Sequence, residues 1–358
     1  MCNIIMKILN KMRGFDYLIL ILMFTSCIHG EKYEGTESFT WNDFTEVRSL
    51  QGTTLSFDSL VMCPTDILVR DSILLLIDKY EDRQIQLYNL DTMKKIGSRI
   101  NSGQGPNDVL QPIFMGSDNE NLRISDMVTS RVLEYSLIDF IKNEKTEPLT
   151  RIQTEKRMMP CVEQMGNDIY GYIMSPKHQI AIFDTMDGKL KQEIVEFPES
   201  SITYTDTERM DAYYMNFATN DRDRLAVCYS MTDLISFYRK DGTLIKQIHG
   251  PEGFFPYFKE IHHGEVVTSS MDRDRNRDAY FSPVNVGNQL FVLFDGEHVS
   301  APDHDMLCEY ILTFTWDGIP QMAYKLDDPV FAFTVDAEKR KIYGISNSPE
   351  YHIIEFTY

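Results

Sequence analysis

The chain has 358 residues, of which 43% are hydrophobic and 12% aromatic, and it carries a formal net charge of −19 at pH 7. This apolar content excludes a disordered chain. The acidic balance excludes a nucleic-acid partner, because binding the phosphate backbone requires a basic surface. The length is enough for a sizeable core in one large or two ordinary domains.

The first 26 residues are predicted to be a targeting segment. Basic residues precede a short apolar run, YLILILMF, at residues 17–24. A run of this length cannot span a hydrocarbon core of about 30 Å, which needs about 20 residues. The pattern is typical of a secretory signal. Translation could begin at Met1 or at Met12, and both start sites stay open.

The signal ends in FTSC, which resembles the lipobox of bacterial lipoproteins. That resemblance implies that Cys27 becomes the lipid-modified first residue. The protein would then be membrane-anchored in the bacterial cell envelope, at the periplasmic or surface face of the outer membrane. An ordinary cleaved signal and a signal anchor are the alternatives. Cys63, Cys161, Cys228 and Cys308 are scattered, and their pairing stays open, although Cys228 and Cys308 fit buried thiols.

The rest of the chain repeats a short pattern. An apolar run ends in an aromatic residue and is followed by a polar turn, often Asp-Gly, the usual signal of a two-residue hairpin. A second apolar run precedes each of these. The six aromatic anchors are Tyr88, Tyr135, Phe183, Phe237, Phe314 and Phe356. Each unit of roughly 45 residues therefore reads as an antiparallel meander.

Six such units with no long helix predict an all-β fold, a six-bladed β-propeller, because packing blades in a ring buries both faces of each meander. We expect a linker at 27–43 and one propeller at 44–358. The last unit ends after its third strand, so its outer strand is expected from FTEVRSLQG, Phe44–Gly52, paired with HIIEFTY. This N-terminal strand would close the ring and remove an open edge. Two β-sandwiches fit the in-phase repeats poorly.

The glycine-rich stretch NSGQGPNDVL, residues 101–110, lies between the first and second units. It lacks the third glycine and the following helix of a dinucleotide site, and it has no Gly-Lys-Ser/Thr of a phosphate-binding loop. A crossover between blades is the better prediction. GQGPND and the segment from Phe314 to Phe356 resemble TolB-like six-bladed propeller lipoproteins of Bacteroides-type bacteria. The resemblance implies an exported, lipid-anchored propeller and brings no activity with it.

Motifs for chemistry are weak, and no cofactor, metal site or catalytic residue is assigned. MDRDRNRDAY, residues 271–280, has the alternate acidic spacing of a calcium loop, but Arg277 and Pro283 replace its required Gly and Glu. FDGEHVSAPDHDM, residues 294–306, groups carboxylates with histidines that could ligate a metal. A polar loop is the simpler interpretation.

Two functions remain. One is a non-catalytic binding or scaffold protein for a glycan, peptide or protein partner. The other is a metal-dependent propeller hydrolase or lyase with a metal in the central channel. The predicted inner strands are largely apolar, with Glu163, Asn216 and Asn285 as polar contributors, which favours binding.

The fifth unit is the longest, with extra residues at 251–278 and 296–306. Loops carry function more often than blade cores do, so we expect this insertion above a binding face. The predicted ligand contacts at the entries of the inner strands are Tyr213, Tyr214, Asn216, Tyr280 and Phe281. Tyr214 and Asn216 share one strand face. The competing hypothesis is that the aromatic residues fill the core between blades.

Overall fold

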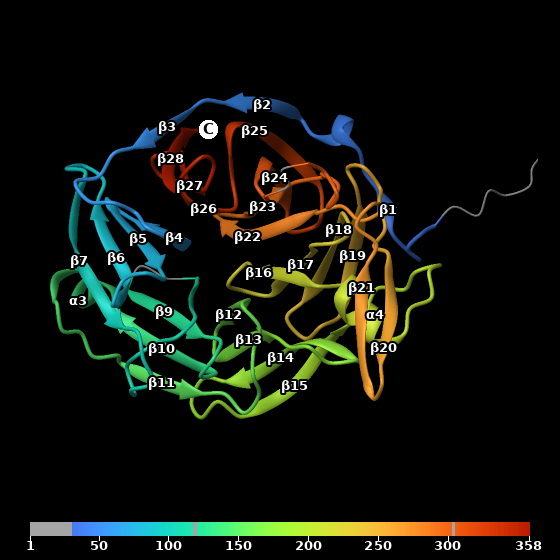
Figure 1. The fold of residues 1–358 in the computed structure, drawn as a ribbon, viewed down its shortest axis with the longest axis horizontal. Helices are drawn as coiled ribbons and strands as arrows, with labels where there is room; N and C mark the ends of the chain where they lie inside the picture. The colour runs from blue at the N-terminus through green and yellow to red at the C-terminus, as the bar shows by residue number, and fades with distance from the viewer. Residues whose placement is uncertain (1–30, 117–119, 303–304) are drawn as a thin grey trace, which may run out of the picture.

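The computed structural model describes residues 31–116, 120–302 and 305–358. Figure 1 shows sheets arranged as blades around a central axis; the N-terminal segment first passes along the outside of three blades, and the chain then forms the six blades in order around the ring. The all-β, six-bladed propeller predicted from the repeats is confirmed. Each aromatic anchor lies on the third strand of its blade and is at most 1% exposed.

The first three blades are four-stranded antiparallel meanders. Blade one contains β4 (Pro64–Arg70), β5 (Ile73–Asp78), β6 (Arg83–Asn89) and β7 (Lys94–Asn101). Blade two contains β8 (Pro112–Met115), β9 (Asn121–Asp126), β10 (Arg131–Ser136) and β11 (Thr150–Gln153). Blade three contains β12 (Val162–Met165), β13 (Asp168–Tyr172), β14 (His178–Asp184) and β15 (Leu190–Glu196).

The other blades each gain a strand from the N-terminal segment. Blade four contains β16 (Met215–Thr219), β17 (Arg224–Tyr229), β18 (Leu234–Arg239), β19 (Leu244–His249) and the added β1 (Glu37–Ser38). Blade five contains β22 (Tyr280–Val286), β23 (Gln289–Phe294), β24 (Cys308–Thr315), β25 (Pro320–Val330) and the added β2 (Glu46–Leu50). Blade six contains β26 (Ala332–Asp336), β27 (Lys341–Ser346), β28 (His352–Thr357) and β3 (Gly52–Leu55).

The core lies between the blades. Leu75 and Leu87 of blade one, for example, share a buried cluster with Ile124 and Leu133 of blade two. Because alternate residues of a strand face opposite sides of its sheet, each middle strand supplies apolar side chains to two neighbouring interfaces. This explains the nearly continuous burial of β5, in which five of six residues are buried.

An N-terminal strand closes the ring, as predicted, but the segment expected to do so was wrong. Residues 46–50 form β2, which runs parallel to β25 on the edge of blade five. The closing strand is β3, which pairs antiparallel with β28 from Gly52 opposite Phe356 to Leu55 opposite Ile353. A Cβ on Gly52 would lie 2.5 Å from Ile354 Cγ2, so this close approach requires glycine.

Contacts with the propeller begin before residue 44, inside the expected linker. Tyr33 and Phe39 are 5% and 6% exposed. The 3-10 helix η1 (Trp41–Asp43) precedes β2, and Trp41 packs against the core between blades four and five. The predicted signal and Cys27 lie outside the described residues.

The glycine-rich stretch joins β7 to β8 and is a crossover, as predicted. The Arg131 guanidinium donates to the carbonyl oxygens of Gly105 and Pro106 at 2.9 Å each and of Asp108 at 3.1 Å. The backbone N–H of Gly105 donates to the Asp108 carboxylate at 3.0 Å. The carbonyl groups of this loop therefore accept hydrogen bonds from the positively charged Arg131 side chain, so their partner lies within the protein.

Two short helices and a hairpin lie outside the blades' own strands. Helix α3 (Leu137–Lys142) follows β10, and helix α4 (Asp206–Ala212) precedes β16. The insertion of the fifth unit forms a hairpin of β20 (Phe258–His263) and β21 (Val266–Met271). Figure 1 shows this hairpin beside α4 at the outer edge of the ring.

Candidate functional site

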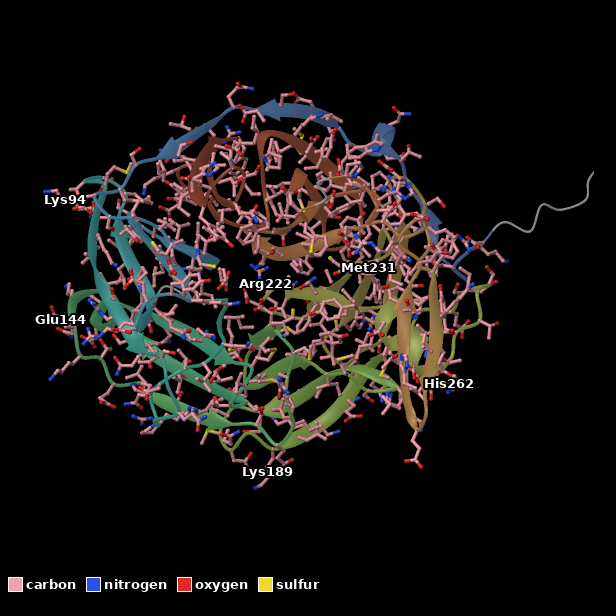
Figure 2. All side chains as sticks on the ribbon, viewed as in Figure 1. Lys94, Glu144, Lys189, Arg222, Met231 and His262 are labelled. Atoms are coloured by element: carbon pink, nitrogen blue, oxygen red, sulfur yellow. The ribbon has the colours of Figure 1, made fainter. Side chains whose placement is uncertain are left out.

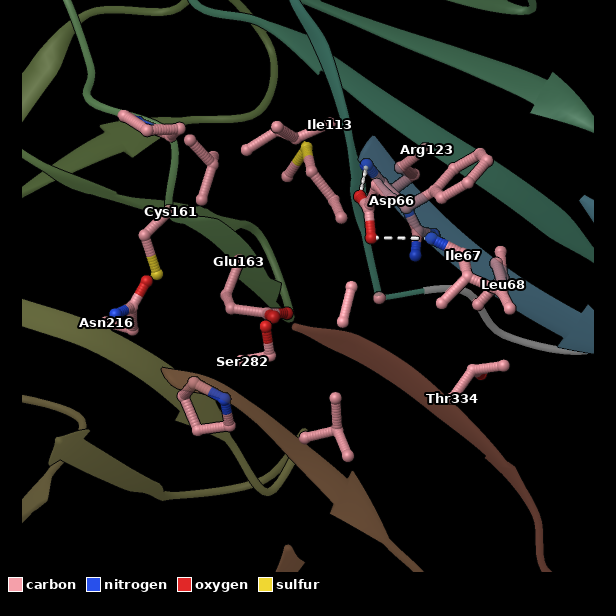
Figure 3. A pocket seen from close by; sticks show the side chains of 18 of the residues that line it. Asp66, Ile67, Leu68, Ile113, Arg123, Cys161, Glu163, Asn216, Ser282 and Thr334 are labelled. Atoms are coloured by element: carbon pink, nitrogen blue, oxygen red, sulfur yellow. Dashed lines mark hydrogen bonds between the residues drawn. The ribbon is translucent and has the colours of Figure 1, made fainter. Parts of the chain in front are cut away.

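The innermost strands of all blades surround one central cavity of about 870 Å³. Its walls come from β4, β8, β12, β16, β22 and β26. Figure 3 shows side chains from several of these strands directed into the same space. The volume falls within the roughly 300–1,000 Å³ of small-molecule sites.

The cavity walls combine apolar and polar surface in similar amounts. Ile113 and Phe114 contribute from β8, Val284 from β22, and Phe333 and Val335 from β26. These residues belong to, or pack against, the hydrophobic clusters between blades, and this packing holds them in place. A ligand here would meet apolar side chains and polar side chains in similar proportion.

Glu163 is the most perturbed acidic group of the cavity. It lies on β12, and Figure 3 shows its carboxyl group directed towards the same part of the cavity as Ser282. Burial, helped by the nearby carboxylates of Asp221 and Asp66, raises the pKa of Glu163 to about 8, against the opposing effect of the Gly116 N–H. The side chain is therefore largely protonated at neutral pH, and it can donate a hydrogen bond.

Asp66 on β4 is a second enclosed carboxyl group. Its side chain accepts hydrogen bonds from the backbone N–H groups of Ile67 and Phe114, both at 2.8 Å. The bond to Phe114 joins blade one to blade two at the channel wall (Figure 3). Burial raises the pKa of Asp66 to about 6, although both N–H donors favour the ionised form.

Other side chains also join inner strands of neighbouring blades. The Cys161 thiol on the blade-three side accepts from the Phe217 N–H at 3.1 Å and donates to the Phe217 carbonyl at 3.3 Å. Burial raises the pKa of this thiol, so it stays protonated. Thr334 accepts from the Val69 N–H at 3.3 Å, which connects blade six to blade one. The cavity thus has a hydrogen-bonded wall.

The polar residues expected from the inner strands do reach the cavity. Asn216 lines it and donates to Ser230 Oγ at 3.1 Å. Asn285 lines it as well, and its amide donates to Asp221 Oδ2 at 3.0 Å. Together with Glu163, these three residues were recognisable in the sequence. Asp66 was missed, although it belongs to the same kind of inner-strand segment, VMCPTDI.

Of the five predicted ligand contacts, Asn216 alone lines the cavity. Tyr213 and Tyr280 are 1% and 0% exposed and lie in the core between blades, where the competing hypothesis placed them. Tyr214 packs on Tyr172 at 5.4 Å between ring centroids, and Phe281 packs against the core between blades five and six. The structure does not bring these five side chains together.

The aromatic side chains of β22 do not line the cavity, whereas residues 282–286 of the same strand do. The strand contains a bulge between Phe281 and Val284, and Ser282 has a φ of +46°, so its backbone is irregular where the cavity lining begins. Tyr280 is held in the core, where its hydroxyl donates to the Gly250 carbonyl.

The insertion at 251–278 contributes no residue to the cavity. Figure 2 labels His262 on the hairpin at the outer rim, whereas Arg222 lies beside the centre of the ring. The insertion therefore does not stand above this cavity. Its first part instead packs between the N-terminal segment and blade four, since Phe255 stacks on Tyr33 at 4.7 Å.

The two weak metal motifs have structural roles in the part of the chain that is described. Asn276 of MDRDRNRDAY is fully buried, and its amide binds the backbone of Tyr257 and Asp272. The loop at 294–306 includes residues 303–304, which lie outside the described ranges. Among the described side chains, no group of three or more His, Cys, Asp or Glu is placed to hold a metal ion.

All four described cysteines are free thiols. Cys228 and Cys308 are buried, as their apolar contexts predicted, while Cys63 and Cys161 are partly exposed. Within the described ranges, no helix combines the length and apolar character needed to cross a bilayer.

The fold and cavity define a six-bladed β-propeller with a ligand-sized central channel. The chain belongs to the TolB-like six-bladed propeller family, whose model matches residues 43–338. This confirms the resemblance read from the glycine-rich crossover and the C-terminal unit. None of the curated proteins matches the sequence.

Two solved structures from Bacteroides resemble the chain. A member of the DUF4221 family from Bacteroides vulgatus has a TM-score of 0.54 at 11% identity, over 87% of this chain and 97% of that one. A protein described as exported, from Bacteroides fragilis, has a TM-score of 0.49 at 11% identity, over 89% of this chain and 98% of that one. At this identity the first similarity shows the fold alone.

Proposed function

We propose that this protein is exported, held in the bacterial envelope by a lipid on Cys27, and binds a small ligand in its central cavity without catalysing a reaction. The observation that carries the binding role is the cavity itself, which all blades line and which encloses Asp66 and Glu163 among both apolar and polar side chains. The proposed anchor is supported by the FTSC sequence.

The cavity chemistry indicates the ligand class. Enclosed carboxyl groups accept hydrogen bonds, and a charge-assisted bond to a carboxylate is stronger than a neutral one. Ile113, Phe333 and Val335 offer apolar contact area. The best fit is a ligand with an apolar surface and several hydrogen-bond donors, as sugars, amines and short peptides present.

The test uses saturation-transfer difference NMR on residues 28–358 with a panel of monosaccharides, primary amines and dipeptides. We expect a binding class whose signal is lost in Asn216→Ala and reduced in Glu163→Gln. The matched control is Glu338→Gln, since Glu338 is exposed in the turn between β26 and β27. Probes that bind both cavity variants as well as the wild type would contradict this proposal.

The same carboxyl groups also keep the metal-dependent alternative testable. Mg²⁺, Ca²⁺, Mn²⁺ and Zn²⁺ are added separately to each probe bound by the wild type. Cleavage of a bound probe that depends on one ion and on Glu163 would replace the binding function with a hydrolase or lyase function.

A further inference from the structure

The hairpin β20–β21 has one covered and one open face. Because side chains alternate along a strand, Glu260 and Ser269 share the face towards α4, where the Ser269 hydroxyl donates to Asp211. The backbone N–H of Glu260 donates to the Glu208 carboxylate of α4 at 2.8 Å. The opposite face consists of exposed residues: Lys259, Ile261, His263, Val266, Thr268 and Ser270.

Aliphatic side chains are exposed on this outer face and at the tip of the hairpin. Ile261 is 38% exposed and Val266 is 60% exposed, both on the outer face. Val267, next to the turn, is 41% exposed. A two-stranded hairpin is marginal by itself in water, and large apolar side chains at its tip add nothing to the core. Their exposure is consistent with a contact made outside this chain.

The described chain begins at the base of this hairpin. Glu31 accepts a hydrogen bond from the Tyr257 hydroxyl and lies 3.7 Å from the Arg275 guanidinium. Tyr257 directly precedes β20, and the Asp272 N–H donates to its carbonyl at 3.0 Å, which closes the base. Figure 1 shows the N-terminal segment and the hairpin on the same flank of the ring.

This placement limits how far a lipid on Cys27 could lie from the hairpin. Four residue steps separate Cys27 from Glu31, and a fully extended chain spans at most about 3.6 Å per residue, so the distance is within about 14 Å. Each strand of the hairpin has six residues, which gives a length of about 20 Å. A bilayer that holds the lipid is therefore within reach of the hairpin.

We propose that the outer face and tip of the β20–β21 hairpin contact the lipid surface to which the chain is anchored. This inference rests on the proposed lipidation of Cys27. The formal charge of −19 disfavours electrostatic attraction to an anionic surface, so Ile261, Val266 and Val267 make an apolar contact with the acyl boundary. Such a second contact fixes the orientation of the ring, which a short tether alone leaves free.

The experiment couples the chain from residue 27 onward through Cys27 to a maleimide-bearing phospholipid in phosphatidylcholine vesicles, in a background with Cys63→Ser and Cys161→Ser, because both of these thiols are partly exposed. Amide hydrogen exchange is compared with that of the same protein in solution without vesicles. Exchange within residues 261–267 should slow about tenfold on the vesicle. The slowing should persist at high salt, because the contact is apolar.

The double variant Ile261→Ser with Val266→Ser should lose this protection while its soluble form unfolds at the wild-type temperature. The matched control is Ile138→Ser with Leu149→Ser, two residues that are 58% and 60% exposed in blade two, on the other side of the ring (Figure 1). The control should keep the protection.

The outcomes separate this inference from the proposed anchor. Unchanged exchange of 261–267 on vesicles, or equal protection in the hairpin variant, would overturn the membrane contact even if Cys27 carries lipid in cells. Protection on the artificial tether would support the contact, and absence of lipid on Cys27 in cells would then reject only the anchor.

Discussion

Replacing Glu163 with Gln should change the stability of the protein in a pH-dependent way. In the unfolded chain this carboxyl titrates near its ordinary pKa of 4.5, and in the folded protein burial raises the pKa to about 8. Between these pH values the unfolded state loses its proton while the folded state keeps it. The free energy of unfolding therefore falls as the pH rises through this window, and it levels off above about 8.

The size of the effect follows from the difference of about 3.5 between the two pKa values. At about 1.4 kcal/mol per pH unit, the upper limit is about 5 kcal/mol. Water in the channel screens the ionised carboxylate, so we expect about 2 kcal/mol. Gln stays neutral and keeps an oxygen that can accept from the Gly116 N–H. Glu163→Gln should thus match the wild type below pH 4.5 and exceed it by about 2 kcal/mol at pH 9.

Denaturant unfolding of residues 28–358 at intervals from acid to alkaline pH would measure this difference, with Glu338→Gln as the control. The control should follow the wild type at every pH. If Glu163→Gln and the wild type differ by a constant amount across the range, the carboxyl group is not protonated in the folded cavity and the reasoning fails.

Three further changes test the fold of the protein and its proposed lipid anchor. The side chain of Asp233 is fully buried and accepts hydrogen bonds from the N–H groups of Glu252, Gly253 and Phe254. Asp233→Ala should therefore lower the free energy of unfolding, measured by urea titration, by about 3–5 kcal/mol. A loss below about 1 kcal/mol would contradict this reasoning. Deleting 52–55 should expose β28, lower the melting temperature sharply and promote aggregation, and a deletion that melts like the wild type would exclude this closure. Metabolic labelling with a lipid precursor should mark the wild type but not Cys27→Ser, whereas equal labelling of both would reject the anchor.

The blade count could be predicted because each blade repeats the same local signals. Buried aromatic residues such as Phe237 and Phe314 recur on the third strand of a blade, and an Asp-Gly turn follows that strand in blades three, four and five. The closing strand was harder to predict, because both 46–50 and 52–55 can form strands. The second pairs with β28, and Gly52 packs closely against Ile354 there, a long-range contact that no local pattern reveals.

The candidate site was predicted in part, for a similar reason. Glu163, Asn216 and Asn285 stood out because a polar residue in an otherwise apolar inner strand is unusual. Tyr280 was expected at the binding face because it lies at the entry of an inner strand, but its side chain is buried in the core between blades, and β22 contains a bulge after Phe281. Local sequence does not reveal such a bulge, since it depends on the pairing with β23.

The polar side chains of the cavity wall have different hydrogen-bond partners within the protein. Substitutions of these side chains therefore have different effects on folding stability and on ligand binding. Asp66 holds blade one to blade two through the Phe114 N–H, so its removal should weaken the fold and any ligand binding together. Burial raises the pKa of Glu163, so its carboxyl group is largely protonated at neutral pH, and this lowers the stability of the folded protein. A ligand with hydrogen-bond donors would favour the ionised carboxylate and so offset this loss of stability. Glu163→Gln should therefore stabilise the protein while weakening binding, a trade-off expected of a group retained for function. A wall whose inner strands are joined by Asp66, Cys161 and Thr334 changes little on binding, so the affinity lost in Glu163→Gln would measure the ligand contact itself.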